Sequence, residues 1–288
     1  MGLTYENLHM LLNARYNGAA FSHILTLGAL EFFIRNKDKI RLSKKFGLDR
    51  NILLNTNTSN DFFIQFLGAK HVTAIDYSDY EKSTLIHDMN IPIAAKYHNS
   101  FDAVIDGGTL EHIFNFPTAL ENCLNVLKKG GNFFAFTMAN NHLGHGFYQF
   151  SPELFFNVLS ESYGLRLEEI VLVEHRFPSA ELTARNKCYS VTDPKELRKR
   201  VGLVSKKPVM MMVHALKISE HFSFAKGYPI QSDYLTLYNN GGLSNPSKPF
   251  IKRLFSLLPK TIQNQIKGLR ELRSYSFQNK RSFHKKRY

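Results

Sequence analysis

Three aspartates stand at the ends of short apolar runs, where a buried β-strand would present a carboxylate to a ligand. They are Asp76, Asp88 and Asp106, and the strands expected before them span residues 72–75, 84–86 and 103–105. An acid at the end of the second strand of a nucleotide-binding βαβ unit accepts hydrogen bonds from ribose hydroxyls, which is the role expected of Asp76. Asp88 is suited to accept from the exocyclic amine of an adenine. A cap or turn role for Asp76, and an Asx-turn for Asp88, stay open as structural alternatives.

Two glycines follow the third of these strands. Gly107 and Gly108 carry no Cβ, so the backbone there can approach a ligand closely. The chain continues with Thr109-Leu110-Glu111-His112, a predicted helix over residues 117–127, Gly130-Gly131 and a predicted strand over residues 132–137.

A polar loop, residues 139–153, follows the last of these strands and holds two histidines, two asparagines, a tyrosine and a glutamine. His145 is the candidate general base, because a neutral imidazole accepts a proton near pH 7, and Tyr148 is the second catalytic candidate. The alternative is that His145 and Tyr148 form a buried hydrogen-bond network that fixes the loop. A metal site at His142 and His145 is not expected, because no third ligand is apparent nearby.

The segment from Phe101 to Thr137 reads FDAVIDGGTLEHIFNFPTALENCLNVLKKGGNFFAFT. Its motifs, FD-V-(x)-GG-x-LEH, a helix ending LK-x-GG and then an aromatic-rich strand, closely resemble those of class I, S-adenosylmethionine-dependent methyltransferases. The run NNxxGHGFYQFSPE is similar to one in a group of bacterial methyltransferase-like proteins. The resemblance extends over roughly residues 22–216, with its specific motifs in the middle.

This resemblance implies that the cofactor and methyl donor is S-adenosylmethionine. The residues expected to bind it are Gly28, Asp76, Asp88, Asp106, Gly107, Gly108 and Thr109. Within this set the resemblance assigns Asp76 to the ribose and Asp88 to the adenine, and it places residues 106–109 along the methionine side. Glu111 and His112 match the family's Glu-His pair, for which we favour support of the following helix over catalysis.

The loop after the first strand departs from the family pattern. The run Thr26-Leu27-Gly28-Ala29-Leu30-Glu31 keeps only the first of three glycines and has a threonine in place of the usual acid. This loop normally wraps the methionine carboxylate and amine, so the departure bears on cofactor affinity. In addition, the interval 28–72 is longer than usual, and the interval 76–88 is shorter than a full strand–helix–strand unit allows.

Strands alternating with helices predict an α/β fold, namely a Rossmann-like, doubly wound, mainly parallel sheet with helices on both faces. Helices are expected at residues 4–15, 61–67 (with Asn60 as N-cap), 117–127, 152–161 and 194–200, and further strands at 22–27, 132–137, 167–173 and 209–216. We expect a methyltransferase-like domain over residues 1–220 and a basic C-terminal extension, helical and then flexible, over residues 221–288.

Composition favours a cytoplasmic protein. The cysteines, Cys123 and Cys188, are far apart and form no CxxC pair, which fits a reducing compartment. The first residues do not have the pattern of a signal peptide, and no apolar run is long enough to cross a bilayer. The net charge of +13 is concentrated at the end of the chain, where residues 248–288 hold twelve Lys or Arg and one acid.

The basic tail has apolar residues at helical spacing over residues 250–258 and 262–272. One interpretation is an amphipathic helix on an anionic membrane, which would place the protein at the inner face of the membrane. Binding to RNA or another anionic polymer is less favoured, because few aromatic residues are available to stack on bases. A solvated extension without a partner is the structural alternative.

Three functions remain in competition. The first is a methyltransferase acting on a hydroxyl or amine of a small molecule or glycan-type acceptor. The second is a non-catalytic binding or scaffold protein with a methyltransferase fold, which the incomplete glycine loop motivates. The third is an RNA methyltransferase, ranked last because the chain lacks the Asn/Asp-Pro-Pro-Tyr/Phe tetrapeptide of many nucleic-acid amino-methyltransferases.

Overall fold

The structure, a computed structural model, describes residues 2–79, 83–175, 186–224, 227–234 and 255–288. Within these residues the chain forms a nine-stranded sheet in the order β11-β9-β8-β10-β7-β6-β2-β4-β5 and a two-stranded sheet of β1 and β3. The strands are β1 (Gly2–Leu3), β2 (His23–Leu27), β3 (Glu31–Phe32), β4 (His71–Asp76), β5 (Leu85–Ile86), β6 (Phe101–Asp106), β7 (Leu127–Asn140), β8 (Leu165–Glu174), β9 (Lys187–Val191), β10 (Val209–Lys217) and β11 (Phe283–Lys286). The helices are α1 (Tyr5–Tyr16), α2 (Asn36–Phe46), α3 (Arg50–Asn55), α4 (Ser59–Phe62), η1 (Phe63–Leu67), η2 (Ala95–Tyr97), η3 (Leu110–His112), α5 (Phe116–Val126), α6 (Pro152–Val158), η4 (Glu161–Tyr163), α7 (Pro194–Leu197) and α10 (Lys260–Ser274).

Five neighbouring strands of the large sheet, β7, β6, β2, β4 and β5, run parallel to one another. Numbered along the chain from β2, they stand in the order 5-4-1-2-3, which is the order of a Rossmann sheet. The direction of winding reverses between β2 and β6, and ligands of such sheets bind beyond the carboxyl ends of the strands at this point. The predicted Rossmann-like fold is confirmed, and Asp76 and Asp106 are the last residues of β4 and β6.

Four antiparallel strands, β10, β8, β9 and β11, extend the parallel half. β8 and β10 confirm two predicted strands, whereas β9 and β11 fall where no strand was predicted. The strand β11 reads FHKK, and its charges suit a sheet edge but give no apolar alternation to detect. The predicted flexible end is therefore wrong for residues 283–286, which pair with residues 188–191. The domain boundary at residue 220 stays a prediction, although the last strand of the expected extension belongs to the main sheet.

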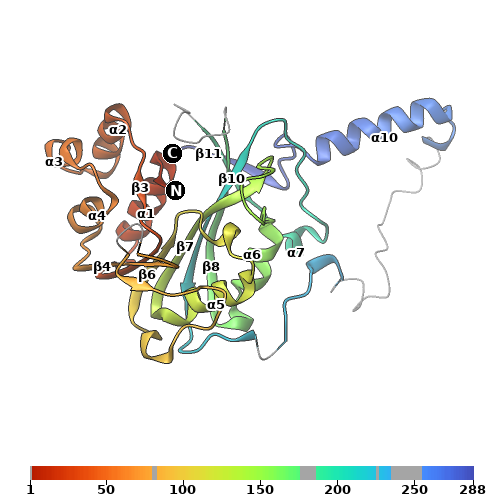
Figure 1. Ribbon diagram of the computed structural model, residues 1–288. Helices are drawn as coiled ribbons and strands as arrows, with labels where there is room; N and C mark the ends of the chain where they lie inside the picture. Colours follow the sequence, from red (N-terminus) through yellow and green to blue (C-terminus); the bar gives the residue numbers. More distant parts are fainter. Residues whose placement is uncertain (1, 80–82, 176–185, 225–226, 235–254) are drawn as a thin grey trace.

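Helices cover both faces of the large sheet (Figure 1). Alternate residues of β7 contact the two layers, since Phe133 and Ala135 belong to one core cluster and Phe134 and Phe136 to the other. Buried side chains of α5 and α6 join the first cluster, and those of α1, α2 and α4 join the second. The sheet is therefore enclosed between two apolar layers, and ligand sites must lie at its edges.

The helix predicted over residues 61–67 is present but begins earlier, as α4, and continues as the π-helix η1. Its N-cap is Thr58, whose hydroxyl accepts from the Asp61 amide at 3.1 Å, and not Asn60 as predicted. Both residues have side chains suited to capping, so local sequence could not choose between them. The helix ends at Gly68, as expected, with a φ of 79°.

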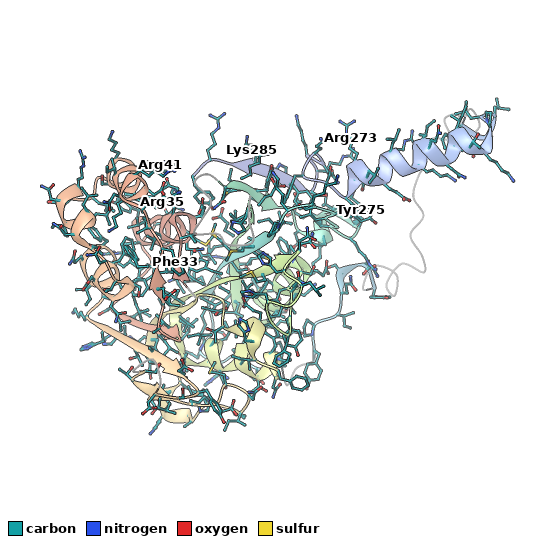
Figure 2. The ribbon with its side chains drawn as sticks, turned by 45° about the horizontal axis from the view of Figure 1, so that its top comes forward. Phe33, Arg35, Arg41, Arg273, Tyr275 and Lys285 are labelled. Carbon is teal, nitrogen blue, oxygen red and sulfur yellow. The ribbon has the colours of Figure 1, made fainter. Side chains whose placement is uncertain are left out.

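The helix α10 stands away from the sheet (Figure 1) and confirms the helix predicted over residues 262–272. Of the helix predicted over residues 250–258, the first five residues lie outside the described ones. Tyr275 attaches the end of α10 to the body (Figure 2): its ring lies where a side chain on Gly202 would have to be, and its carbonyl accepts from the Val204 amide at 2.7 Å. Within the described ranges, every helix is too short or too polar to cross a bilayer.

Candidate active site

Gly28, Asp76 and Thr109 meet at the carboxyl ends of β2, β4 and β6. Gly28 has a φ of 72°, and a Cβ built on it would lie 3.7 Å from Asp76 Oδ2 and 3.9 Å from Thr109 Oγ1. The Thr109 hydroxyl donates to the Leu27 carbonyl at 3.0 Å, and the Gly28 amide donates to the Ile75 carbonyl at 2.8 Å. The fold thus brings a carboxylate, a hydroxyl and a backbone segment without a Cβ together at the point where the direction of winding reverses.

Asp106 is fully buried and caps the turn that follows β6. Its Oδ1 accepts from the amides of Gly108, Thr109 and Leu110 at 3.0, 2.7 and 3.4 Å. Burial raises the pKa of Asp106 to about 6, although these three hydrogen bonds act in the opposite direction. Asp106 therefore holds the 107–110 turn in place, a task that the sequence did not reveal beside the predicted contact with the cofactor.

Gly107 lies against the side chain of Leu30. A Cβ on Gly107 would come within 2.5 Å of Leu30 Cδ2, so any larger residue would displace that leucine. Leu30 is buried, and its carbonyl accepts from the Ser59 hydroxyl at 2.6 Å. The close neighbour of Gly107 in this structure is thus Leu30, from the loop in which the family pattern has glycines.

The long interval between Gly28 and Val72 has a structural explanation. After Leu30 the chain forms β3, which pairs in parallel with β1, and it does not enter a helix directly. The helices α2, α3, α4 and η1 follow before β4 begins. The first strand of the parallel half, β2, is therefore linked to the second, β4, by one strand of the small sheet and by several helices.

Asp88 follows β5, at the outer edge of the parallel half. Its Oδ1 accepts from the Asn90 amide at 2.9 Å and from the Asn90 side chain at 2.8 Å, and these hydrogen bonds lower the pKa of Asp88. This is the geometry of the Asx-turn alternative. The His87 amide donates to the Asp76 carbonyl at 2.8 Å, which ties this turn to the end of β4. Contact between Asp88 and an adenine stays a prediction.

Glu111, in η3, is a buried acid directly after the 107–110 turn. Its Oε2 accepts from the Thr137 hydroxyl of β7 at 2.7 Å, whereas Oε1 has no hydrogen-bond partner among the described residues. Burial, together with the negative charge of Asp106, raises the pKa of Glu111 to about 8. Both effects favour the protonated form of the Glu111 carboxyl group.

The polar loop of residues 141–149 folds back onto η3. The Tyr148 amide donates to the Glu111 carbonyl at 3.1 Å, and the Tyr148 hydroxyl donates to the Phe114 carbonyl at 2.6 Å. Gly146 is needed at the closest approach, because a Cβ there would lie 2.8 Å from the Glu111 carbonyl oxygen and 3.1 Å from His112 Nδ1. Tyr148 thus fixes the loop, as the structural alternative proposed, and its catalytic role stays a prediction.

His145 lies at the tip of this loop, with 32% of its side chain exposed. Its Nε2 is 3.7 Å from Glu111 Oε1. Burial lowers the pKa of His145, so its imidazole is neutral at neutral pH and can accept a proton. At this distance the two groups are in contact but do not form a hydrogen bond.

The fold supplies the metal-ligand candidates that the sequence did not show. Ligand atoms of Glu111, His112 and His145 all lie within 4.8 Å of one another. The metal site that was not expected, at His142 and His145, is a different one, because this group joins His145 to two residues of η3 and leaves His142 out. His142 is buried, its ring centroid lies 5.9 Å from that of His145, and burial lowers its pKa to about 4.

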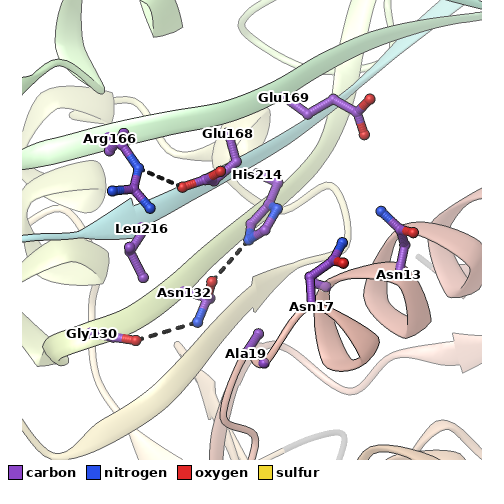
Figure 3. A pocket seen from close by; sticks show the side chains of 12 residues that line it. Asn13, Asn17, Ala19, Gly130, Asn132, Arg166, Glu168, Glu169, His214 and Leu216 are labelled. Carbon is purple, nitrogen blue, oxygen red and sulfur yellow. Dashed lines mark hydrogen bonds and ion pairs between the residues drawn. The ribbon is translucent and has the colours of Figure 1, made fainter.

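A cavity of about 390 Å³ lies at the opposite end of the parallel strands (Figure 3). The end of α1 and the starts of β7 and β8 form much of its wall, and His214 Nε2 lies 2.9 Å from Asn132 Oδ1 inside it. Asn132 is near the start of β7, whereas Asn140 ends that strand at the edge where Asp76 and Asp106 lie. This cavity is therefore separate from the carboxyl ends of the parallel strands, where Asp76 and Asp106 lie.

Residues 59–135 match the family model of the methyltransferase domain. The matched segment includes Asp76, Asp88, residues 106–109 and Glu111, and it leaves Gly28 and His145 outside. The comparison with curated proteins finds no match.

Several solved structures are similar to this chain. A SAM-dependent methyltransferase from Thermotoga maritima, described as a possible histamine N-methyltransferase, is 13% identical over 74% of this chain and 90% of that chain, with a TM-score of 0.38. The N-methyltransferase NodS from Bradyrhizobium japonicum, in complex with S-adenosyl-L-homocysteine, is 14% identical over 74% and 87%, with a TM-score of 0.40. The 1,6-didemethyltoxoflavin-N1-methyltransferase from Burkholderia thailandensis is 12% identical over 73% and 77%, with a TM-score of 0.37.

The family match and the order of the parallel strands concern the same part of the chain. The matched segment runs from α4 through β4, β5 and β6 into β7, which is most of the parallel half of the sheet. The strand ends of this segment carry Asp76, Gly107, Gly108 and Thr109, which belong to the motifs that resemble those of methyltransferases. Residues 59–135 are thus similar to the methyltransferase domain, and the parallel strands that they contribute stand in the order of a Rossmann sheet.

Proposed function

We propose that the protein transfers the methyl group of S-adenosylmethionine to a hydroxyl or amine of a small molecule or glycan-type acceptor. The observation that carries the proposal is that Gly28, Asp76 and Thr109 meet where the direction of winding of the sheet reverses. The loop that carries His145 folds onto η3, directly after Thr109. The donor and acceptor sides of such a reaction must adjoin, because the enzyme's main task is to align the methyl group with the attacking atom.

The donor side has groups that fit an adenosyl ligand. S-adenosylmethionine supplies an electrophilic methyl group on a sulfonium centre. Asp76 would accept from the ribose hydroxyls, and the backbone at Gly28 and Gly108 would lie against the ligand where no Cβ intervenes. Asp106 would act by keeping the 107–110 turn in shape. The fit is incomplete at Gly107, because Leu30 occupies the space beside it.

The acceptor side combines a base with exposed aromatic rings. His145 would take the proton that an acceptor hydroxyl or amine loses as the methyl group arrives. Phe114 and Phe147 are 72% and 69% exposed, with ring centroids 6.0 Å apart at 83°. Exposed rings of this kind pack well against a flat or sugar-like ligand. The combination supports a ring-containing acceptor that carries a nucleophilic oxygen or nitrogen.

S-adenosylhomocysteine is expected to raise the melting temperature of the purified protein. A ligand that binds only the folded state stabilises it by RT ln(1 + [L]/Kd), which is about 2.7 kcal/mol at a hundredfold excess over Kd. Differential scanning fluorimetry over a ligand series measures the shift, and adenosine and methionine tested separately show which half of the ligand is held.

A folded protein with an unchanged melting temperature at millimolar S-adenosylhomocysteine would contradict the proposal. That result would favour the second function, a methyltransferase fold used for binding or as a scaffold. The contact of Leu30 with Gly107 is the observation that keeps this alternative in view. The variant Leu30→Gly then tests whether that side chain blocks the site, since its removal would restore the shift.

For the helix α10 we propose contact with an anionic membrane surface. Ile262, Leu269 and Leu272 are 41%, 67% and 65% exposed, and their spacing places them on one stripe of the helix. The same helix carries Lys260, Lys267, Arg270 and Arg273, with one acid, Glu271. An exposed apolar stripe among cations favours a lipid surface over RNA, because bases would require aromatic rings to stack on.

The variant Leu269→Glu is expected to weaken binding to vesicles rich in phosphatidylserine by about tenfold or more. It removes an apolar side chain and adds a negative charge, and each change costs about 1 kcal/mol or more at an anionic surface. Asn264→Asp is the matched control, because it adds the same charge on the opposite face of α10. Cosedimentation measures the vesicle binding of both variants. Equal losses of binding would show attraction by charge alone and would contradict insertion of the apolar stripe into the membrane.

A further inference from the structure

Glu111, His112 and His145 form a group of metal ligands that the reaction proposed above does not require. One ligand atom from each lies within 4.8 Å of the other two. A tetrahedral ion with metal–ligand distances near 2.0–2.1 Å separates its ligands by about 3.4 Å. Because His112 and His145 are both exposed, their side chains have room to rotate, and such rotation would have to close this difference.

The buried oxygen of Glu111 is independent evidence for a cation at this place. The Glu111 side chain has no exposed surface, and its Oε1 lacks a hydrogen-bond partner among the described residues. Unpaired buried polar atoms are rare and costly, and a bound ion is one of the ordinary explanations for them. This oxygen lies 3.7 Å from His145 Nε2, within the group of ligands.

The loop that carries His145 is built to stay close to η3. The Tyr148 amide is bound to the Glu111 carbonyl, and Gly146 sits where a Cβ would come within 3.1 Å of His112 Nδ1. The Thr137 hydroxyl, donating to Oε2, orients the Glu111 carboxyl group so that Oε1 faces His145. Such outer hydrogen bonds are what hold metal ligands in position.

We propose that Glu111, His112 and His145 bind one divalent transition-metal ion, of which zinc is the type. Two imidazoles and a carboxylate are the ligand set of many zinc enzymes, which keep a further position open for water or substrate. Here that position would face solvent, because both histidines are exposed.

A consequence for the reaction rests on the proposed function. An acceptor hydroxyl bound to the ion at its open position would lose its proton more readily to bulk water, which reaches this exposed position, because a bound cation lowers the pKa of an attached oxygen. His145 would then act as a ligand and not as the base. Two of the three ligands, Glu111 and His112, directly follow the 107–110 turn in the chain.

The test uses the full chain without an affinity tag, stripped of metal by a chelator. Co²⁺ is titrated in the absence of donor and acceptor, and its visible absorption reports the number and type of its ligands. We expect one Co²⁺ per chain, displaced by Zn²⁺. His145→Ala should weaken binding about 100-fold or more, since even outer-shell changes cost 10–100-fold. Glu111→Gln should do the same.

The control is His221→Ala, which removes an exposed histidine outside the ligand group and should leave the titration unchanged. Because the His145 side chain is partly exposed, His145→Ala folds even if Glu111→Gln does not. The proposal is overturned if Co²⁺ is not taken up at one per chain, or if His145→Ala binds it as tightly as the original protein. Neither outcome affects the S-adenosylhomocysteine experiment, so failure of this site and failure of the methyltransferase proposal are distinguishable.

Discussion

Asp106→Ala is expected to lower the free energy of unfolding by about 3 kcal/mol or more. The substitution removes the acceptor of three amides, those of Gly108, Thr109 and Leu110, at the buried end of β6. A buried donor left without a partner costs about 1–3 kcal/mol. Urea denaturation measures the loss as a lower midpoint with an unchanged slope.

Asp106→Asn separates the acceptor from the charge. Asparagine keeps an oxygen where Oδ1 accepts the amides and carries no charge, so we expect an unfolding free energy close to that of the original protein near pH 4, where Asp106 is protonated. Because the pKa of Asp106 is raised to about 6, the folded protein binds more protons than the unfolded chain between about pH 4 and pH 6. The original protein should therefore gain stability relative to Asp106→Asn as the pH falls through this window. If asparagine destabilises as much as alanine, the explanation by the lost acceptor fails.

Asp76→Ala is expected to weaken S-adenosylhomocysteine binding by about 100-fold. Asp76 lies beside Gly28 at the end of β4, and its Oδ1 is engaged only by the following amide, that of Tyr77, at 2.6 Å among the described contacts. Two hydrogen bonds from ribose hydroxyls to a carboxylate would be lost, each contributing about 1.5–3 kcal/mol before reorganisation. Isothermal titration calorimetry measures the loss of affinity.

The matched control is Asp79→Ala, which removes an exposed acid three residues further along the same turn. It should bind S-adenosylhomocysteine like the original protein. Both variants should melt at the original temperature without ligand, since neither carboxylate supports the core. Equal affinity in Asp76→Ala and Asp79→Ala would remove Asp76 from the cofactor site and, with it, the donor geometry proposed above.

The parallel half of the sheet could be predicted because its signals are local. The strands β2, β4, β6 and β7 are continuous apolar runs that end in glycine, acid or polar residues, as buried parallel strands do. The helix α5 has an apolar stripe and a proline in its first turn, and α6 has Ser151 as its N-cap, with Pro152 in the first turn. Such features arise within a few residues, so chain order was enough to place them.

The edge strands and the tail could not be predicted in the same way. β9 and β11 are short, and β11 is charged, so their extended conformation depends on pairing with a neighbour. The C-terminal Tyr288 ring lies 4.4 Å from that of His9 on α1, a contact between opposite ends of the chain. Neither the pairing nor the contact leaves a periodic signal.

The residues of the candidate site likewise fall into those that local sequence indicated and those that only long-range contacts brought together. By itself, the sequence determined the acids and glycines at the strand ends and the polar loop after β7, because strand ends in a parallel sheet share one edge. Only the tertiary structure decided that Asp106 caps its own turn, that Leu30 lies on Gly107 and that Glu111 and His112 reach His145. The physical reason is distance along the chain: local propensity decides which segments become strands and helices, whereas contacts between remote residues depend on how those elements pack.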